Sequence, residues 1–138
     1  MPVPEILLLY RCSPHRIHSR TCYSIAALKG FVERADLDGA DLFEANLSRA
    51  DLAGASLIAA NLTGANLSGA DLSEANLNRA DLSETNLDGA NLSDANMPNA
   101  NPTGANLSHV DLPGANLDGV IGADFSRAKN VPPKYLKD

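Results

Sequence analysis

The sequence predicts an all-β solenoid, in which short coils of chain stack along one axis instead of enclosing a wide core. Three observations predict this fold. Leucine occupies every fifth position from Leu37 to Leu92, and the same spacing continues to Leu117. A period of five matches neither the 3.6 residues of a helical turn nor the strict alternation of an ordinary strand. Aromatic residues make up only 4% of the chain, so a wide interior could not be filled.

The repeat occupies residues 35–120 and contains seventeen consecutive units without an insertion. Alanine stands two residues before the central position, except at Thr85 and Val110, and Asp or Asn stands between them, except at Ser56. Met97 and Pro102 replace the central leucine in two units. We predict that the leucines form the structural core: Leu37, Leu42, Leu47, Leu52, Leu57, Leu62, Leu67, Leu72, Leu77, Leu82, Leu87, Leu92, Leu107, Leu112 and Leu117.

The positions between the leucines predict regular corners. Asn, Asp, Ser and Gly recur in these positions, and each favours turns over helix interiors. Glycine follows the leucine by two residues in eight units, where we expect a positive φ. These glycines are Gly39, Gly54, Gly64, Gly69, Gly89, Gly104, Gly114 and Gly119.

The unit Ala65-Asn66-Leu67-Ser68-Gly69 resembles the repeat of the pentapeptide-repeat family, and the resemblance covers about 86 residues. It implies that four units form one square coil of a right-handed quadrilateral parallel β-helix, with leucine and alanine pointing inward. Seventeen units then predict about 4 to 5 coils, stacked at roughly 4.8 Å. The family is especially numerous in cyanobacteria.

The two ends depart from the repeat. We predict an irregular segment over residues 1–23 and a short helical cap over residues 24–34, which would shield the first coil. Residues 121–138 should form a C-terminal cap and a loose tail, because Phe125 lies in a unit displaced by three residues. Pro102 removes a backbone donor and should soften its coil, either as repeat decay or as a functional kink.

The sequence does not indicate an enzyme, and we predict no catalytic, cofactor-binding or metal-binding residue. Catalysis needs converging groups, but the repeats contain one His, no Cys and no Lys. Cys12, His15, His18 and Cys22 have a spacing that matches no established zinc pattern. The glycine-rich nonapeptide of calcium-binding β-rolls and the threonine ladder expected of an ice-binding face are also absent from the sequence.

Charge is unevenly distributed. The repeats contain thirteen Asp and Glu residues against two Arg, whereas both ends carry a net positive charge. Residues twenty apart should lie above one another, which sorts the carboxylates into two opposite faces. The first acidic face is the candidate interaction face and contains Asp51, Asp71, Glu74, Asp94 and Asp111. The second acidic face contains Asp41, Glu44, Asp81 and Glu84.

These faces predict a protein partner with a basic surface, in a non-enzymatic scaffold or interaction module. Direct binding to nucleic acid would require Lys and Arg to neutralise phosphates. Two other interpretations stay open. The acidity could serve only to keep the rod soluble, or the rod could be a DNA mimic that acts on DNA gyrase, as its resemblance to quinolone-resistance pentapeptide-repeat proteins implies.

The apolar segments are too short for a signal sequence or a membrane span, because the run Ile6–Tyr10 has only five residues. We therefore expect a cytoplasmic protein that does not bind membranes. Phe43 and Ile58 are the only large apolar residues predicted to point outward from the repeats. They form either a small contact patch or scattered surface residues.

Overall fold

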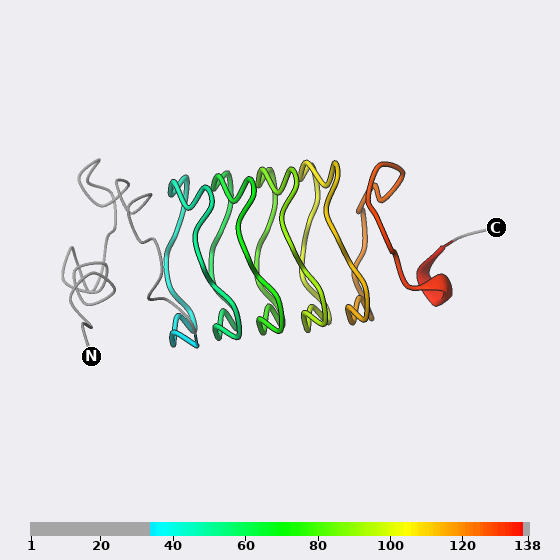
Figure 1. Ribbon diagram of the computed structural model, residues 1–138. Helices are drawn as coiled ribbons and strands as arrows, with labels where there is room; N and C mark the ends of the chain where they lie inside the picture. Colours follow the sequence, from blue (N-terminus) through cyan, green and yellow to red (C-terminus); the bar gives the residue numbers. More distant parts are fainter. Residues whose placement is uncertain (1–33, 137–138) are drawn as a thin grey trace.

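The computed structural model describes residues 34–136, which form a rod of stacked coils (Figure 1). The coils follow one another along a single axis, from the cyan coil near residue 34 to the orange coil that ends the repeats. The predicted irregular segment, residues 1–23, lies outside the described residues. So does the predicted helical cap, apart from Arg34.

Parallel β-bridges between residues twenty apart join each coil to the next. Asp51 pairs with Asp71, Asp71 with Asn91, and Asn91 with Asp111. The other three sides of the coil contain equivalent ladders, each formed by single bridge residues rather than by extended strands. The residue pairs at the beginning and end of the regular series are Asp36↔Ser56 and Asn96↔Asn116. An offset of twenty corresponds to four five-residue units per coil.

Backbone hydrogen bonds repeat with the same regularity. The Leu72 N–H donates to the Asn91 carbonyl at 2.8 Å, and the Glu74 N–H donates to the Ser93 carbonyl at 2.8 Å. Within the unit, the Ala75 N–H donates to the Leu72 carbonyl at 3.0 Å and closes the corner. Because these bonds pair the backbone of the inner coils, either with a neighbouring coil or within the corner, the chain can bend four times per coil without burying unpaired groups there.

The interior is a narrow column of leucine and alanine. The fifteen central leucines are at most 3% exposed, and the alanines two residues before them are buried or nearly so. Thr85 is also fully buried at an alanine position, where its hydroxyl donates to the Leu62 carbonyl at 2.8 Å. That hydrogen bond satisfies the one buried polar side chain among the described residues.

All seventeen corner residues have a positive φ. The eight glycines have φ values of 65–73°, as the glycine pattern predicted. Nine residues with side chains adopt the same left-handed conformation at φ 53–59°, although this region is unfavourable for most L-residues. The corner geometry is therefore imposed by the coil and does not depend on glycine alone.

Ala59, at φ 55°, provides a test of this corner strain. Substitution Ala59→Gly should raise the free energy of unfolding by about 0.5–1 kcal/mol, because relief of the left-handed strain exceeds the entropy that glycine adds to the unfolded chain. The matched control Ala53→Gly lies at a neighbouring corner position without a positive φ and should be destabilising. Urea denaturation measures both changes, and equal signs would contradict the prediction.

After Val120 the chain leaves the twenty-residue register. Lys129 pairs with Asp111 across eighteen residues instead of twenty. The displaced unit nevertheless repeats the corner, because the Ala128 N–H donates to the Phe125 carbonyl at 3.0 Å. Phe125 packs against the core, and the 3-10 helix η2 (Pro133–Tyr135) follows beyond the last coil (Figure 1).

The described part of the chain contains no helix that is long and apolar enough to span a membrane.

Candidate functional site

The first acidic face runs along one ladder and the corners beside it. Asp51, Asp71 and Asp111 belong to this ladder, and all three are half-buried. Glu74 and Asp94 are exposed corner residues twenty positions apart, in neighbouring coils. The structure thus brings the five predicted residues onto one side of the rod. Asn91 lies between Asp71 and Asp111 and interrupts the row of charges.

The ladder aspartates also shape the corners. The Ala53 N–H donates to Asp51 Oδ1 at 3.2 Å, and the Ser73 N–H donates to Asp71 Oδ1 at 3.0 Å. Asn91 accepts the same bond from the Ser93 N–H at 3.0 Å. Because asparagine supplies the same acceptor oxygen, the corner requires the oxygen but not the negative charge. The charge on Asp51 and Asp71 is therefore additional to what the fold needs.

The second acidic face has the same construction on the opposite ladder. Asn61 lies between Asp41 and Asp81, and its amide donates to Asp41 Oδ1 at 3.1 Å. The hydrogen bond from the Ser83 hydroxyl, at 2.6 Å, holds the pKa of Asp81 below its usual value, against the opposing effect of partial burial. Asp81 therefore stays ionised at neutral pH. Glu44 and Glu84 are exposed corner residues.

No face carboxylate forms an ion pair within residues 34–136, although Lys129 occupies the ladder position next to Asp111. Lys134 and Asp118 form an ion pair at 3.1 Å, and His109 Nδ1 lies 2.8 Å from Asp88 Oδ1. Both aspartates lie outside the two faces. The nine face carboxylates are thus free of ion pairs within the described residues, and hydrogen bonds between the coils hold their backbone in place.

The described residues contain no group of three or more His, Cys, Asp or Glu side chains that could hold a metal ion. The spaced set Cys12, His15, His18 and Cys22 lies outside the described residues. An open hollow of about 580 Å³ is found at the C-terminal end of the rod, where Ile121, Phe125 and Leu136 contribute to its lining.

The two large apolar residues that were predicted to point outward from the repeats, Phe43 and Ile58, are half-buried. The exposed large apolar residues of the described part are instead Ile121, at 79%, and Leu136, at 57%. Their position beyond the last regular unit was the one signal that could have identified them.

These features define a β-helical repeat protein with two acidic faces. A family model described as "Pentapeptide repeats" matches in eight copies over residues 32–57, 50–89 and 85–121. The chain belongs to the pentapeptide repeat family, as the resemblance of its repeat unit indicated, and its rod is a parallel β-helix.

Solved structures of family members resemble this chain. HetL, a protein involved in heterocyst differentiation regulation in Nostoc sp. strain PCC 7120, is 40% identical over 70% of this chain, with a TM-score of 0.49. The match covers 43% of HetL, so this chain spans less than half of that protein. The pentapeptide repeat protein alr5209 of Nostoc PCC 7120 is 39% identical over 70% of this chain and 86% of its own length, with a TM-score of 0.45.

A structure of QnrB1, a plasmid-mediated fluoroquinolone resistance protein, is 25% identical over 67% of this chain and 51% of its own, with a TM-score of 0.35. Comparison with curated protein sequences gives no match.

Proposed function

We propose that this protein is a non-enzymatic interaction scaffold and that its first acidic face binds a protein partner with a basic surface. One observation carries the proposal. The charge on Asp51 and Asp71 is not needed for the corners that these residues form, because Asn91 performs the same structural task without charge. The carboxylates of the face form no ion pair within the described residues.

The rigidity of the ladder favours recognition. Neighbouring coils are held about 4.8 Å apart by backbone hydrogen bonds, so the carboxylates occupy fixed positions before a partner arrives. Binding then costs little ordering entropy on this side of the interface. Complementary charge would speed association and make the affinity sensitive to salt. A partner with Lys and Arg side chains at a matching spacing fits this surface.

The DNA-mimic alternative, directed at DNA gyrase, receives less support from the ladders. Double-stranded DNA carries one negative charge per about 1.7 Å of its axis. Here a charged ladder position is followed by an amide at Asn61 and Asn101 on one face and at Asn91 on the other. The charge is therefore sparser than that of a phosphate backbone, which favours a discrete basic protein surface as the ligand.

A four-residue variant tests the proposal. Substitution of Asp51, Asp71, Asp94 and Asp111 with asparagine removes four charges and keeps the corner acceptors, so the fold should stay intact. The matched control changes Asp41 and Asp81 to asparagine and Glu44 and Glu84 to glutamine. Both variants and the wild type are used as bait in native lysate at low and high salt, and the affinity of any captured protein is then measured with purified components.

We expect the first-face variant to lose at least about tenfold in affinity, which corresponds to about 1.4 kcal/mol, while the control retains binding. Equal losses in both variants would mean that net charge alone is recognised. Unchanged binding, or the capture of no partner, would contradict the proposal and would mean that the acidic residues serve only to keep the rod soluble. Inhibition of gyrase supercoiling that is lost in the first-face variant would support the DNA mimic instead.

A further inference from the structure

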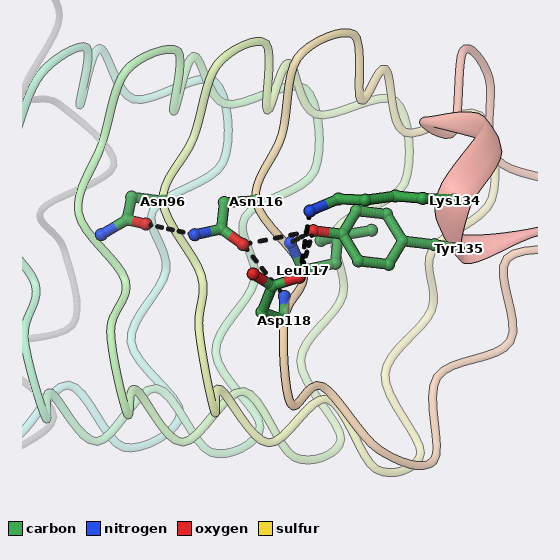
Figure 2. A network of polar contacts seen from close by, with 6 residues as sticks. All are labelled: Asn96, Asn116, Leu117, Asp118, Lys134 and Tyr135. Carbon is green, nitrogen blue, oxygen red and sulfur yellow. Dashed lines mark hydrogen bonds and ion pairs between the residues drawn. The ribbon is translucent and has the colours of Figure 1, made fainter.

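The C-terminal end of the rod contains a tyrosine where the next coil should be. In the regular coils, the Leu77 N–H donates to the Asn96 carbonyl at 2.7 Å, and the Met97 N–H donates to the Asn116 carbonyl at 2.8 Å. The repeat ends before it can supply the next carbonyl of this series. The Leu117 N–H instead donates to the hydroxyl of Tyr135 at 2.9 Å (Figure 2).

The same hydroxyl also ends a ladder of side-chain amides. Asn96 donates to Asn76 Oδ1 at 3.3 Å, and Asn116 donates to Asn96 Oδ1 at 3.1 Å. A further coil would provide the next amide, facing Asn116 Oδ1. The Tyr135 hydroxyl lies 3.2 Å from that oxygen and occupies this place (Figure 2). The phenol oxygen thus accepts the Leu117 N–H in place of a carbonyl of the missing coil, and it lies where the next amide of the ladder would be.

Asp118 and Lys134 hold the tyrosine in position. The Tyr135 hydroxyl has a single proton, and it donates this proton to Asp118 Oδ1, at 2.8 Å, in preference to the more distant neutral Asn116 oxygen. Lys134 Nζ lies 3.1 Å from the same carboxylate oxygen and 4.6 Å from the centre of the Tyr135 ring. These contacts connect η2 to the last corner of the repeats.

We propose that residues 132–136 form a C-terminal strap, in which the Tyr135 hydroxyl replaces one carbonyl of the missing coil and prevents this side of the end of the rod from pairing with another chain. An uncovered end of a β-structure presents unpaired N–H and C=O groups that can template the addition of a further strand. The strap satisfies the Leu117 N–H on this side of the last coil. Tyr135 therefore acts structurally, by holding the backbone of Leu117 in place at the end of the solenoid.

Amide hydrogen exchange of the full-length chain tests the hydrogen bond. Tyr135→Phe keeps the ring and removes only the hydroxyl, so we expect the Leu117 amide to exchange at least about tenfold faster. The matched control is Ser108→Ala, which removes a hydroxyl without a hydrogen-bond partner among the described residues. It should leave the Leu117 amide unchanged, and the central Leu72 amide should be unchanged in both variants. If the Leu117 amide of Tyr135→Phe exchanged at the wild-type rate, the proposed role of the Tyr135 hydroxyl at the end of the rod would be overturned.

Sedimentation velocity tests the protection against pairing. Tyr135→Ala removes both ring and hydroxyl, and we expect it to associate at lower concentrations than the wild type, whereas Ser108→Ala should not. In a double-mutant cycle of Tyr135→Ala and Asp118→Ala, the two losses in the free energy of unfolding should not add, because Tyr135 and Asp118 are hydrogen-bonded to each other. The same association behaviour in Tyr135→Ala and wild type would overturn the protective role of the strap.

Discussion

Substitution Leu72→Ala should lower the free energy of unfolding by about 3 kcal/mol, within the range of about 2–5 kcal/mol seen for buried leucines. Leu72 is fully buried in the middle of its column, between Leu52 and Leu92 in the neighbouring coils. The hydrogen bonds of the surrounding backbone keep the coils about 4.8 Å apart, so they cannot collapse into the cavity. Urea denaturation followed by far-ultraviolet circular dichroism measures the loss.

Leu72→Met is the matched control for this experiment. Methionine conserves most of the volume and should cost less than about 1.5 kcal/mol. A change below about 1 kcal/mol for Leu72→Ala would contradict the prediction, because it would mean that the column is loosely packed and can close around a missing side chain.

Substitution Ala75→Leu should destabilise the rod by about 3 kcal/mol or more, at the upper end of the usual cost of overpacking. Ala75 is fully buried, with Ala55 and Ala95 at the equivalent positions of the neighbouring coils. The backbone around it is bonded on both sides, because the Asn76 N–H donates to the Ala55 carbonyl at 2.8 Å and the Asn96 N–H donates to the Ala75 carbonyl at 2.9 Å. A larger side chain must therefore separate paired coils.

Ala53→Leu provides the comparison for Ala75→Leu, because the same atoms are added at a half-buried corner. We expect a change of less than about 0.5 kcal/mol at this surface position. The structure also indicates where the limit of size lies, since Thr85 and Val110 are accommodated at alanine positions with 0% exposure. If Ala75→Leu unfolds at the same urea concentration as the wild type, interior space does not explain the alanine.

Most of the repeat geometry could be predicted from the sequence, because it results from short-range periodicity. The prediction of a positive φ at glycine corners is confirmed, but the same conformation at Glu74 and Asp94 has no comparable signal in residue type. Corners in this fold are imposed by stacking, which can force a residue with a side chain into the left-handed region. The helical cap over residues 24–34 and the number of coils stay predictions.

The candidate site was predicted in part. The twenty-residue offset places Asp51 and Asp71 on one ladder, as expected from four units per coil. The sequence did not reveal that these aspartates accept backbone hydrogen bonds at their corners, a structural role that needs the side-chain oxygen but not its charge. Whether the acidic face binds a partner stays a prediction that the asparagine variants test.

The sequence by itself determined the regular part of this protein, because a five-residue pattern of leucine and alanine has one efficient way to bury its apolar side chains while pairing its backbone. Tertiary structure decided how the C-terminal end of the repeats is closed. Nothing in the pattern around Tyr135 indicates that its hydroxyl meets Leu117 and Asp118, eighteen and seventeen residues earlier in the chain. A repeat specifies its neighbours by periodicity, but the closure of its last coil depends on which side chain can satisfy the groups that the next coil would have bound.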